Sequence, residues 1–190
     1  MDIHEHQAKD ILAQFGVPVP KGGLAFSPEQ AAYRARDLGL PCVVKAQIHS
    51  GGRGEAGGVK LCKTEGEVRD YAADLLGRTL VTKQTGAAGK TVHRLWVEDA
   101  TDIAQEIYLG FVLDRKSERI MIVASGHGGM EIEDLAHEDP DSLVRMVIDP
   151  ATGLAEFQAR ELAFRLGLKG KQIGQMVTTV HGVPPLAPIS

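Results

Sequence analysis

A glycine-rich stretch between two apolar runs constrains the fold of this chain more than any other feature. Five of the eight residues from 51 to 58 are glycine, and Arg53 lies among them. The preceding run, residues 42–46, is apolar apart from Lys45. Glycine leaves main-chain N–H groups open to phosphate oxygens, and lysine and arginine supply the balancing positive charge. The segment therefore predicts two strands joined by a loop that binds a nucleotide polyphosphate.

This loop differs from the two common phosphate-binding motifs. It lacks the pattern GxxxxGK[ST], and it returns into an apolar run at residues 59–62 instead of opening a helix. A glycine loop between two strands favours a lid that closes over phosphates, and a mobile hairpin tip without a ligand is the alternative. Lys45 ends an apolar run, which indicates an ammonium that emerges from the core at a fixed place. A solvated surface lysine is the alternative there.

Composition narrows the class of protein. The chain has 190 residues, 43% of them hydrophobic and 24% charged, with a net charge of −4, which is typical of a globular protein without a basic nucleic-acid face. No apolar run approaches the roughly 20 residues of a membrane helix, and the polar amino terminus is unlike a secretory signal. Cys42 and Cys62 lie in apolar runs without CxxC spacing, so we expect buried thiols and a cytoplasmic location.

Hydrophobic periodicity predicts an α+β chain. Helices are expected at residues 4–15, 28–38, 65–76, 131–137, 156–166 and 171–181. The first should bury a stripe formed by Ala8, Ile11, Leu12 and Phe15. Ser27 and Thr64 are the expected N-caps of the second and third helices. Strands are expected at residues 23–26, 42–46, 59–62, 92–98, 106–114 and 119–125, and the last two form a predicted antiparallel hairpin.

The change from helical to strand patterns places a boundary near Gly89–Lys90. We expect one subdomain over about residues 20–89, which carries the glycine-rich lid, and a second lobe formed by the remainder. A cleft between two such lobes is the expected ligand site.

Two further clusters have a functional and a plain structural interpretation. Residues 98–102, which include Glu98, Asp99 and Asp102, come directly after the apolar part of the expected strand, residues 92–97. Acidic groups and carbonyls there could bind an adenine amino group or ribose hydroxyls, or form a solvated turn. Glu106 could face the same cleft. Residues 126–129 form a second glycine cluster, which is either an anion site or, as we favour, a turn from sheet to helix. The histidines show no paired metal-ligand spacing.

The order of several motifs resembles one family, the β subunits of succinate–CoA ligase, which are ATP-grasp enzymes. The resemblance covers nearly everything from residue 1 to about residue 182. It rests on His4-Glu5-His6-Gln7-Ala8-Lys9, Val43-Val44-Lys45-Ala46-Gln47-Ile48-His49, Gly51-Gly52-Arg53-Gly54, Leu80-Val81-Thr82, Val97-Glu98, Thr101-Asp102-Ile103, Glu106-Ile107-Tyr108-Leu109-Gly110, Asp114-Arg115, Gly128-Gly129-Met130-Glu131-Ile132-Glu133 and Arg160-Glu161-Leu162-Ala163-Phe164.

The resemblance implies an ATP-grasp fold of two α/β subdomains with a nucleotide cleft between them. It implies an ADP-forming acid–thiol ligase of the tricarboxylic acid cycle that uses ATP or GTP with Mg²⁺, through a phosphohistidine on a partner α subunit. The implied nucleotide-binding residues are Gly52, Arg53 and Gly54 at the phosphates, Lys45 at the phosphate and base-side groups, Glu98 and the following residues to Thr101 at the base, and Glu106 at the ribose. No catalytic residue is assigned to this chain, and neither nucleic acid nor a membrane is an expected partner.

Two departures from the family limit what the resemblance implies. Glu55 replaces a lysine of the family loop, and we expect its side chain to face solvent. The family continues past the last helix into a strand with magnesium ligands, whereas residues 184–190 here form a proline-rich tail that does not match. We therefore expect an ATP-grasp domain over residues 1–183, truncated at its carboxyl end, with no metal ligands and no ligase activity by itself. The alternatives are a malate–CoA ligase β subunit, which matches about as well, and a non-catalytic nucleotide-binding fragment.

Overall fold

A computed structural model describes residues 3–115, 117–129, 137, 139 and 142–183 of the chain. Contacts divide it into two compact units. The first comprises residues 1–11 and 19–102, and the second comprises residues 12–18 and 103–190. Each unit has its own hydrophobic core.

The first unit is built on a four-stranded antiparallel sheet with the strand order β1-β6-β2-β3. Its strands are β1 (Gly22–Ala25), β2 (Cys42–Ala46), β3 (Val59–Cys62) and β6 (Leu95–Asp99). The strands β2 and β3 pair directly, so the glycine-rich segment is the connection of a β-hairpin, as predicted. A separate two-stranded sheet joins β4 (Thr79–Leu80) to β5 (Lys90–Thr91).

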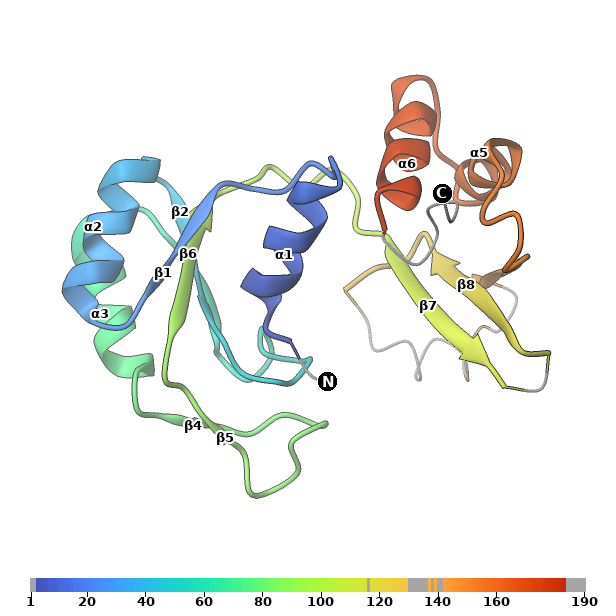
Figure 1. The fold of residues 1–190 in the computed structure, drawn as a ribbon. Helices are drawn as coiled ribbons and strands as arrows, with labels where there is room; N and C mark the ends of the chain where they lie inside the picture. Colours follow the sequence, from blue (N-terminus) through green and yellow to red (C-terminus); the bar gives the residue numbers. More distant parts are fainter. Residues whose placement is uncertain (1–2, 116, 130–136, 138, 140–141, 184–190) are drawn as a thin grey trace. The chain divides into compact units, whose positions relative to one another are not determined.

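Helices lie on both faces of this sheet (Figure 1). The helices α2 (Pro28–Leu38) and α3 (Glu65–Leu75) cover one face, and α1 (Glu5–Gln14) lies on the other. Ser27 and Thr64 cap α2 and α3 as predicted, since their hydroxyls accept hydrogen bonds from the main-chain N–H groups of Gln30 and Glu67.

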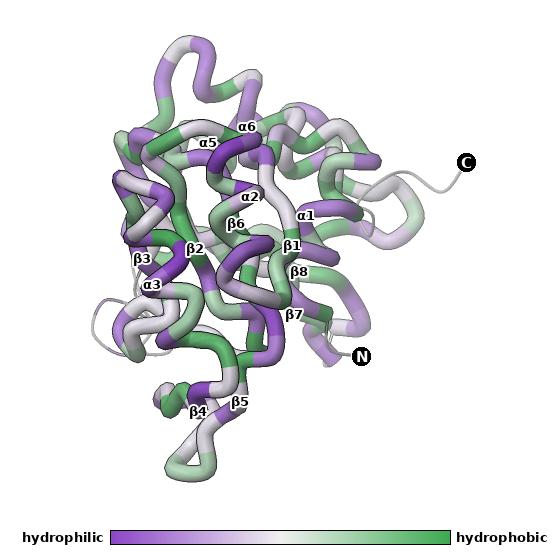
Figure 2. The backbone as a smooth tube through the Cα atoms, turned by 90° about the vertical axis from the view of Figure 1, so that its left-hand side faces the viewer, coloured by the Kyte–Doolittle hydropathy of each residue, from purple (hydrophilic) through white to green (hydrophobic). Residues whose placement is uncertain are grey.

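Alternation along the strands separates an apolar face from a polar one. Cys42, Val44 and Ala46 of β2 and Leu95 and Val97 of β6 are fully buried in the core beneath α2 and α3. In Figure 2, hydrophobic segments mark β2 and β6. The intervening side chains point to the opposite face, towards α1, and they include Lys45, Trp96 and Glu98. The fold therefore places charged residues where a helix covers them.

The second unit is a three-stranded antiparallel sheet with two helices packed against it. The strands are β7 (Tyr108–Asp114), β8 (Arg119–Ser125) and β9 (Val144–Ile148), and the helices are α5 (Glu156–Arg165) and α6 (Lys171–His181). The predicted hairpin of β7 and β8 is confirmed. Ile122 and Ala124 of β8 pack on Leu162 of α5 and Val180 of α6 within a fully buried core.

Three expectations about organisation are wrong. Residues 95–99 do not belong to the second lobe, because β6 lies between β1 and β2 in the first sheet. The division between the units accordingly falls after Asp102 rather than near Gly89–Lys90. In α1 the predicted stripe is not the buried face, since Ile11 and Phe15 are exposed and His6 is buried.

The strand β9 of the second unit lies outside the elements expected from the sequence. The helix expected at residues 131–137 and the proline-rich tail lie outside the described residues. None of the helices that the structure describes is long and apolar enough to span a membrane.

Candidate functional site

Lys45 is held at the polar face of the sheet by two carboxylates. Its ammonium pairs with Glu98 and lies 3.2 Å from Oε1 of Glu5. Burial alone would lower the pKa of Lys45, but the hydrogen bond that it donates to Glu98 and the charge of Glu5 raise it above the ordinary value. The lysine therefore stays charged, and its ammonium emerges at a fixed place, as expected for the end of a buried strand.

Glu98 is buried at the centre of this face. One of its oxygens accepts from Lys45, and the other accepts from Lys9 and from the indole N–H of Trp96 at 2.8 Å. The structure places Glu98 within β6, not after its end, with both carboxylate oxygens occupied by protein donors. Its predicted contact with a nucleotide base is not tested by this geometry.

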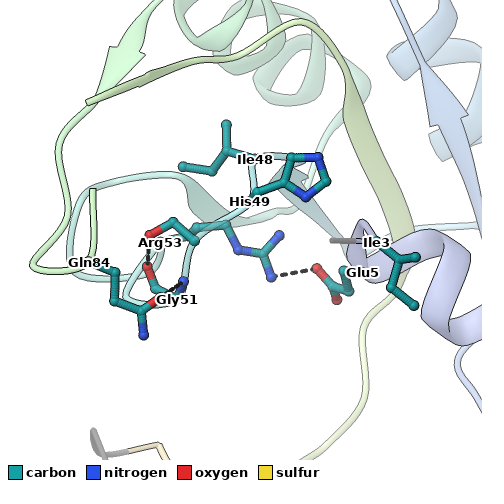
Figure 3. Close-up of a pocket in the computed structure, with 8 residues that line it drawn as sticks. Ile3, Glu5, Ile48, His49, Gly51, Arg53 and Gln84 are labelled. Atoms are coloured by element: carbon teal, nitrogen blue, oxygen red, sulfur yellow. Dashed lines mark hydrogen bonds and ion pairs between the residues drawn. The ribbon is translucent and has the colours of Figure 1, made fainter. Parts of the chain in front are cut away.

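Arg53 reaches from the glycine-rich loop towards α1 (Figure 3). Its guanidinium donates to the main-chain oxygen of Ala46 at 2.7 Å and to Oε2 of Glu5 at 2.7 Å. These two contacts hold the arginine beside the same carboxylate that pairs with Lys45. The structure thus brings three sequence-predicted residues, Lys45, Arg53 and Glu98, into one charged cluster.

Glu5 and Lys9 complete the cluster, and the interpretation of the sequence did not single them out as site residues. They stand four residues apart on α1, and their side chains form an ion pair at 2.9 Å. Burial would raise the pKa of Glu5, but the hydrogen bond from Lys9 and the charges of Arg53 and Lys45 lower it far below the usual range. Opposite charges at i and i+4 in the sequence indicate an ion pair, usually one on the helix surface. Here the side chains of both partners are mostly buried.

Hydrogen bonds from outside the loop fasten the glycine-rich segment on two sides. The main-chain N–H of Gly51 donates to Oε1 of Gln84 at 2.7 Å, and the hydroxyl of Ser50 lies 2.6 Å from that of Thr82. The phenol of Tyr71 donates to the main-chain oxygen of Gly57 at 2.8 Å. The glycine-rich loop is therefore anchored by hydrogen bonds to neighbouring segments in this structure, unlike a hairpin tip without such contacts. Its predicted movement as a lid remains a prediction.

The other residues predicted from the loop lie as follows. Gly52 is half-buried and has a φ of +66°, a backbone conformation that favours glycine. Gly54 is exposed, and so is Glu55, as expected for a side chain that faces solvent.

A pocket of about 520 Å³ opens beside the loop in the first unit (Figure 3). Its lining comprises the polar residues Glu5, Arg53 and Gln84 together with Ile3 and residues 48–51. A stack of imidazole rings stands at this end of the unit, with 3.8 Å between the ring centroids of His4 and His49. The pocket is large enough for a small ligand, and its walls carry the donors that an anion needs.

Thr101 and Glu106 do not join this cluster within the first unit. Thr101 is exposed at the end of that unit, and Glu106 belongs to the second unit. There the main-chain oxygen of Glu106 accepts from the N–H of Gly128 at 3.0 Å, so the second glycine cluster packs against this residue. The contacts of Thr101 and Glu106 with a nucleotide stay predictions.

No group of three or more potential metal ligands occurs among the described residues. The carboxylates of Glu5 and Glu98 are already engaged by lysine and arginine. They do not fit the role of magnesium ligands, which need free carboxylate oxygens.

Comparison with known proteins places the chain in one family. A family model described as an ATP-grasp domain matches residues 2–187, which runs past residue 183, where we expected the match to end. The chain is 59% identical over 181 residues to a probable malate–CoA ligase subunit β of Mesorhizobium japonicum, covering 95% of the chain and 46% of that protein. It is 51% identical over 178 residues to a succinate–CoA ligase [ADP-forming] subunit β of Bacillus pumilus, covering 93% of the chain and 46% of that protein. The chain thus spans about half the length of the curated relatives that it matches.

Solved structures agree on the fold. The protein PH1788 of Pyrococcus horikoshii superposes with a TM-score of 0.69 at 21% identity, over 94% of this chain and 75% of that one. A dinucleotide-forming acetyl-coenzyme A synthetase 1 of Ca. Korarchaeum cryptofilum gives a TM-score of 0.65 at 22% identity, over 96% of this chain and 81% of that one.

Proposed function

The chain belongs to the ATP-grasp domain family, and we propose that it is the ATP-binding part of the β subunit of an ADP-forming acid–CoA ligase. The proposed reaction joins succinate to CoA with conversion of ATP to ADP and phosphate. It proceeds through a phosphohistidine on a partner α subunit. The relatives that support this proposal carry these activities in their names, and they are 50–59% identical to the chain.

The observation that carries the proposal is the position of two cations beside the glycine-rich loop. Lys45 and Arg53 are both bonded to Glu5, and Arg53 lines the adjoining pocket. With Lys9, the cluster has three cations against the two carboxylates Glu5 and Glu98, so it keeps one net positive charge. Such a site attracts the oxygens of a polyphosphate.

Transfer of a phosphoryl group depends mainly on positioning and charge stabilisation, and these residue types can supply both. In the proposed site Lys45 and Arg53 bind phosphate oxygens, and the main chain at Gly52 and Gly54 approaches them closely. The proposed roles of Glu98 and Thr101 at the base and of Glu106 at the ribose rest on the family resemblance.

Magnesium would accompany the nucleotide, and we expect its protein ligands outside the described residues. We also propose a cytoplasmic location, with which the two free, buried cysteines are compatible.

Titration of the purified chain with ATP tests the proposal. We expect binding that weakens at least tenfold in Lys45→Ala, since one charge-assisted contact to phosphate is lost. The exposed Lys63 offers a matched control, because it is not among the residues that line the pocket, and Lys63→Ala, which removes the same charge, should bind as the parent does. Absence of binding by the parent chain, or equal affinity of Lys45→Ala, would contradict the assignment.

Malate is a second candidate for the acid. The relative with the higher identity, 59% against 51%, bears the name of a malate–CoA ligase subunit. The assay is CoA-ester formation from succinate or malate by a full-length β subunit that carries this chain, together with its α subunit, and a strong preference for malate would replace succinate in the proposal.

A further inference from the structure

One carboxylate, that of Glu5, gathers donors from three parts of the first unit. Its Oε1 lies 2.9 Å from the ammonium of Lys9 and 3.2 Å from that of Lys45. Its Oε2 lies 2.7 Å from the guanidinium of Arg53 and 3.3 Å from the amide nitrogen of Gln47. The helix α1, the end of β2 and the glycine-rich loop therefore converge on a single side chain.

The surroundings of Glu5 fix its position. Its neighbour His6 is buried, and the main-chain N–H of His6 donates to Oε1 of Gln47 at 3.2 Å. The side chains of Glu5, Lys9 and Arg53 are each less than one-fifth exposed. A carboxylate so placed restricts the motion of every cation that it contacts.

We propose that Glu5 is a positioning residue that holds Lys45 and Arg53 in the arrangement that receives the phosphates of the nucleotide. This inference rests on the proposed function and adds to it a residue from the first helix. Glu5 itself contributes no contact to the ligand, because its negative charge would repel phosphate. It acts through the two cations.

The direction in which the affinity for ATP changes on removal of Glu5 separates a positioning role from competition with phosphate. Lys9, Lys45 and Arg53 repel one another, and among the described residues Glu98 is the one carboxylate besides Glu5 that pairs with the two lysines. If Glu5 positions the cations, its removal lets Arg53 move towards solvent, and the affinity for ATP falls. If Glu5 instead competes with phosphate for them, its removal raises the net charge of the cluster and the affinity increases.

The experiment is titration of the full chain with ATP, comparing the parent with Glu5→Gln. Glutamine keeps the size of the side chain and removes the charge. We expect affinity about tenfold weaker, as for the loss of a charge-assisted hydrogen bond. Glu55→Gln removes the same charge from an exposed position of the loop and measures the purely electrostatic effect, which should be a small gain in affinity. An affinity of Glu5→Gln equal to or above that of the parent overturns the proposal.

A double-mutant cycle excludes a merely structural effect. If Glu5 acts through Arg53, Glu5→Gln should weaken ATP binding markedly less in an Arg53→Ala background than in the parent. A general loosening of the fold would weaken binding by the same factor in both backgrounds, and that result would overturn the proposal.

The two proposals fail in different ways. If the parent chain does not bind ATP, the proposed function fails and the role of Glu5 fails with it. If the parent binds ATP and loses affinity in Lys45→Ala but not in Glu5→Gln, the function stands and the positioning role is wrong.

Discussion

Lys45 and Glu98 form an ion pair on a diagonal of the sheet. The register sets Lys45 of β2 opposite Trp96 of β6 and Val43 opposite Glu98, so the two charged residues are diagonal neighbours on one face. Trp96, itself buried, donates its indole N–H to Glu98 at 2.8 Å. The strand that carries the proposed phosphate-binding lysine is thus tied to the strand beside it through that lysine.

Loss of the Glu98 carboxylate should destabilise the first unit strongly. Glu98→Ala leaves the ammonium groups of Lys9 and Lys45 mostly buried with one fewer counter-charge, and breaking a buried pair in this way costs about 3–5 kcal/mol. Urea unfolding measures the loss through the fluorescence of Trp96, which is the one tryptophan in the sequence and lies in this unit.

The matched control for this measurement is an exposed ion pair. Arg78 and Asp74 lie 3.0 Å apart on the surface, with side chains about half exposed or more. Asp74→Asn should change the free energy of unfolding by less than about 1 kcal/mol, because exposed pairs contribute little. Similar losses in the two variants would show that the Glu98 cluster does not stabilise the unit.

The stability of the first unit should fall between pH 6.5 and 5 because of His4. Burial, followed by the nearby His49, Arg94, His6 and Arg53, lowers the pKa of His4 from 6.5 to about 4. The unfolded chain therefore binds a proton in this range that the folded chain does not, and the free energy of unfolding decreases as the pH falls.

Urea midpoints at pH 7, 6 and 5 test this linkage. In His4→Gln the midpoint should depend less on pH over this range than in the parent. The exposed His93 supplies the control, since His93→Gln should retain the dependence of the parent. An unchanged slope in His4→Gln would mean that His4 does not titrate with folding.

Local patterns in the sequence identified most elements of both units. Serine and threonine caps located α2 and α3, apolar runs located β2 and β3, and alternation located β7 and β8, because each signal arises within a few residues. The strand β9 was overlooked although it also alternates, with Met146 and Ile148 buried and Arg145 and Val147 exposed.

The parts that escaped prediction depend on contacts distant in sequence. Nothing local in residues 95–99 indicates that β6 lies between β1 and β2. The apolar stripe of α1 suggested the wrong buried face, because Glu5 and Lys9 gain partners from residues some 40 to 90 positions away. Lys45 and Arg53 were identified from the sequence, whereas the carboxylate that joins them required the tertiary structure.

Gly22 should not tolerate even a methyl group. A Cβ at this position would lie 2.5 Å from the Cε2 and Cζ2 atoms of Trp96, so the indole would have to move away from Glu98. We expect Gly22→Ala to lower the free energy of unfolding by about 1–3 kcal/mol through overpacking, and to shift the emission of Trp96.

Alanine at a second glycine of the same unit, Gly66, should stabilise the chain. Gly66 lies within α3, and a Cβ there would meet only the hydroxyl of Thr64, at 3.8 Å. Gly66→Ala should stabilise the chain by about 0.5–1 kcal/mol, because alanine favours the helix. If Gly22→Ala were equally stabilising, the close approach of Trp96 to the backbone would be incorrect.

The two thiols of the first sheet should react only when the unit opens. Cys42 and Cys62 face each other across β2 and β3, and both are fully buried. Burial, with the neighbouring Cys62 and Asp99, raises the pKa of Cys42 to about 11, and burial also raises that of Cys62. Since the thiolate is the reactive form, iodoacetamide should modify both thiols slowly at pH 8 and at a common rate.

Mass spectrometry follows the labelling, and Asp10→Cys supplies an exposed thiol on α1 that should react at the rate of a free cysteine. Rapid labelling of Cys62 alone would indicate that β3 separates from β2 in the folded chain, and the glycine-rich loop between them would then be free to move without unfolding of the sheet.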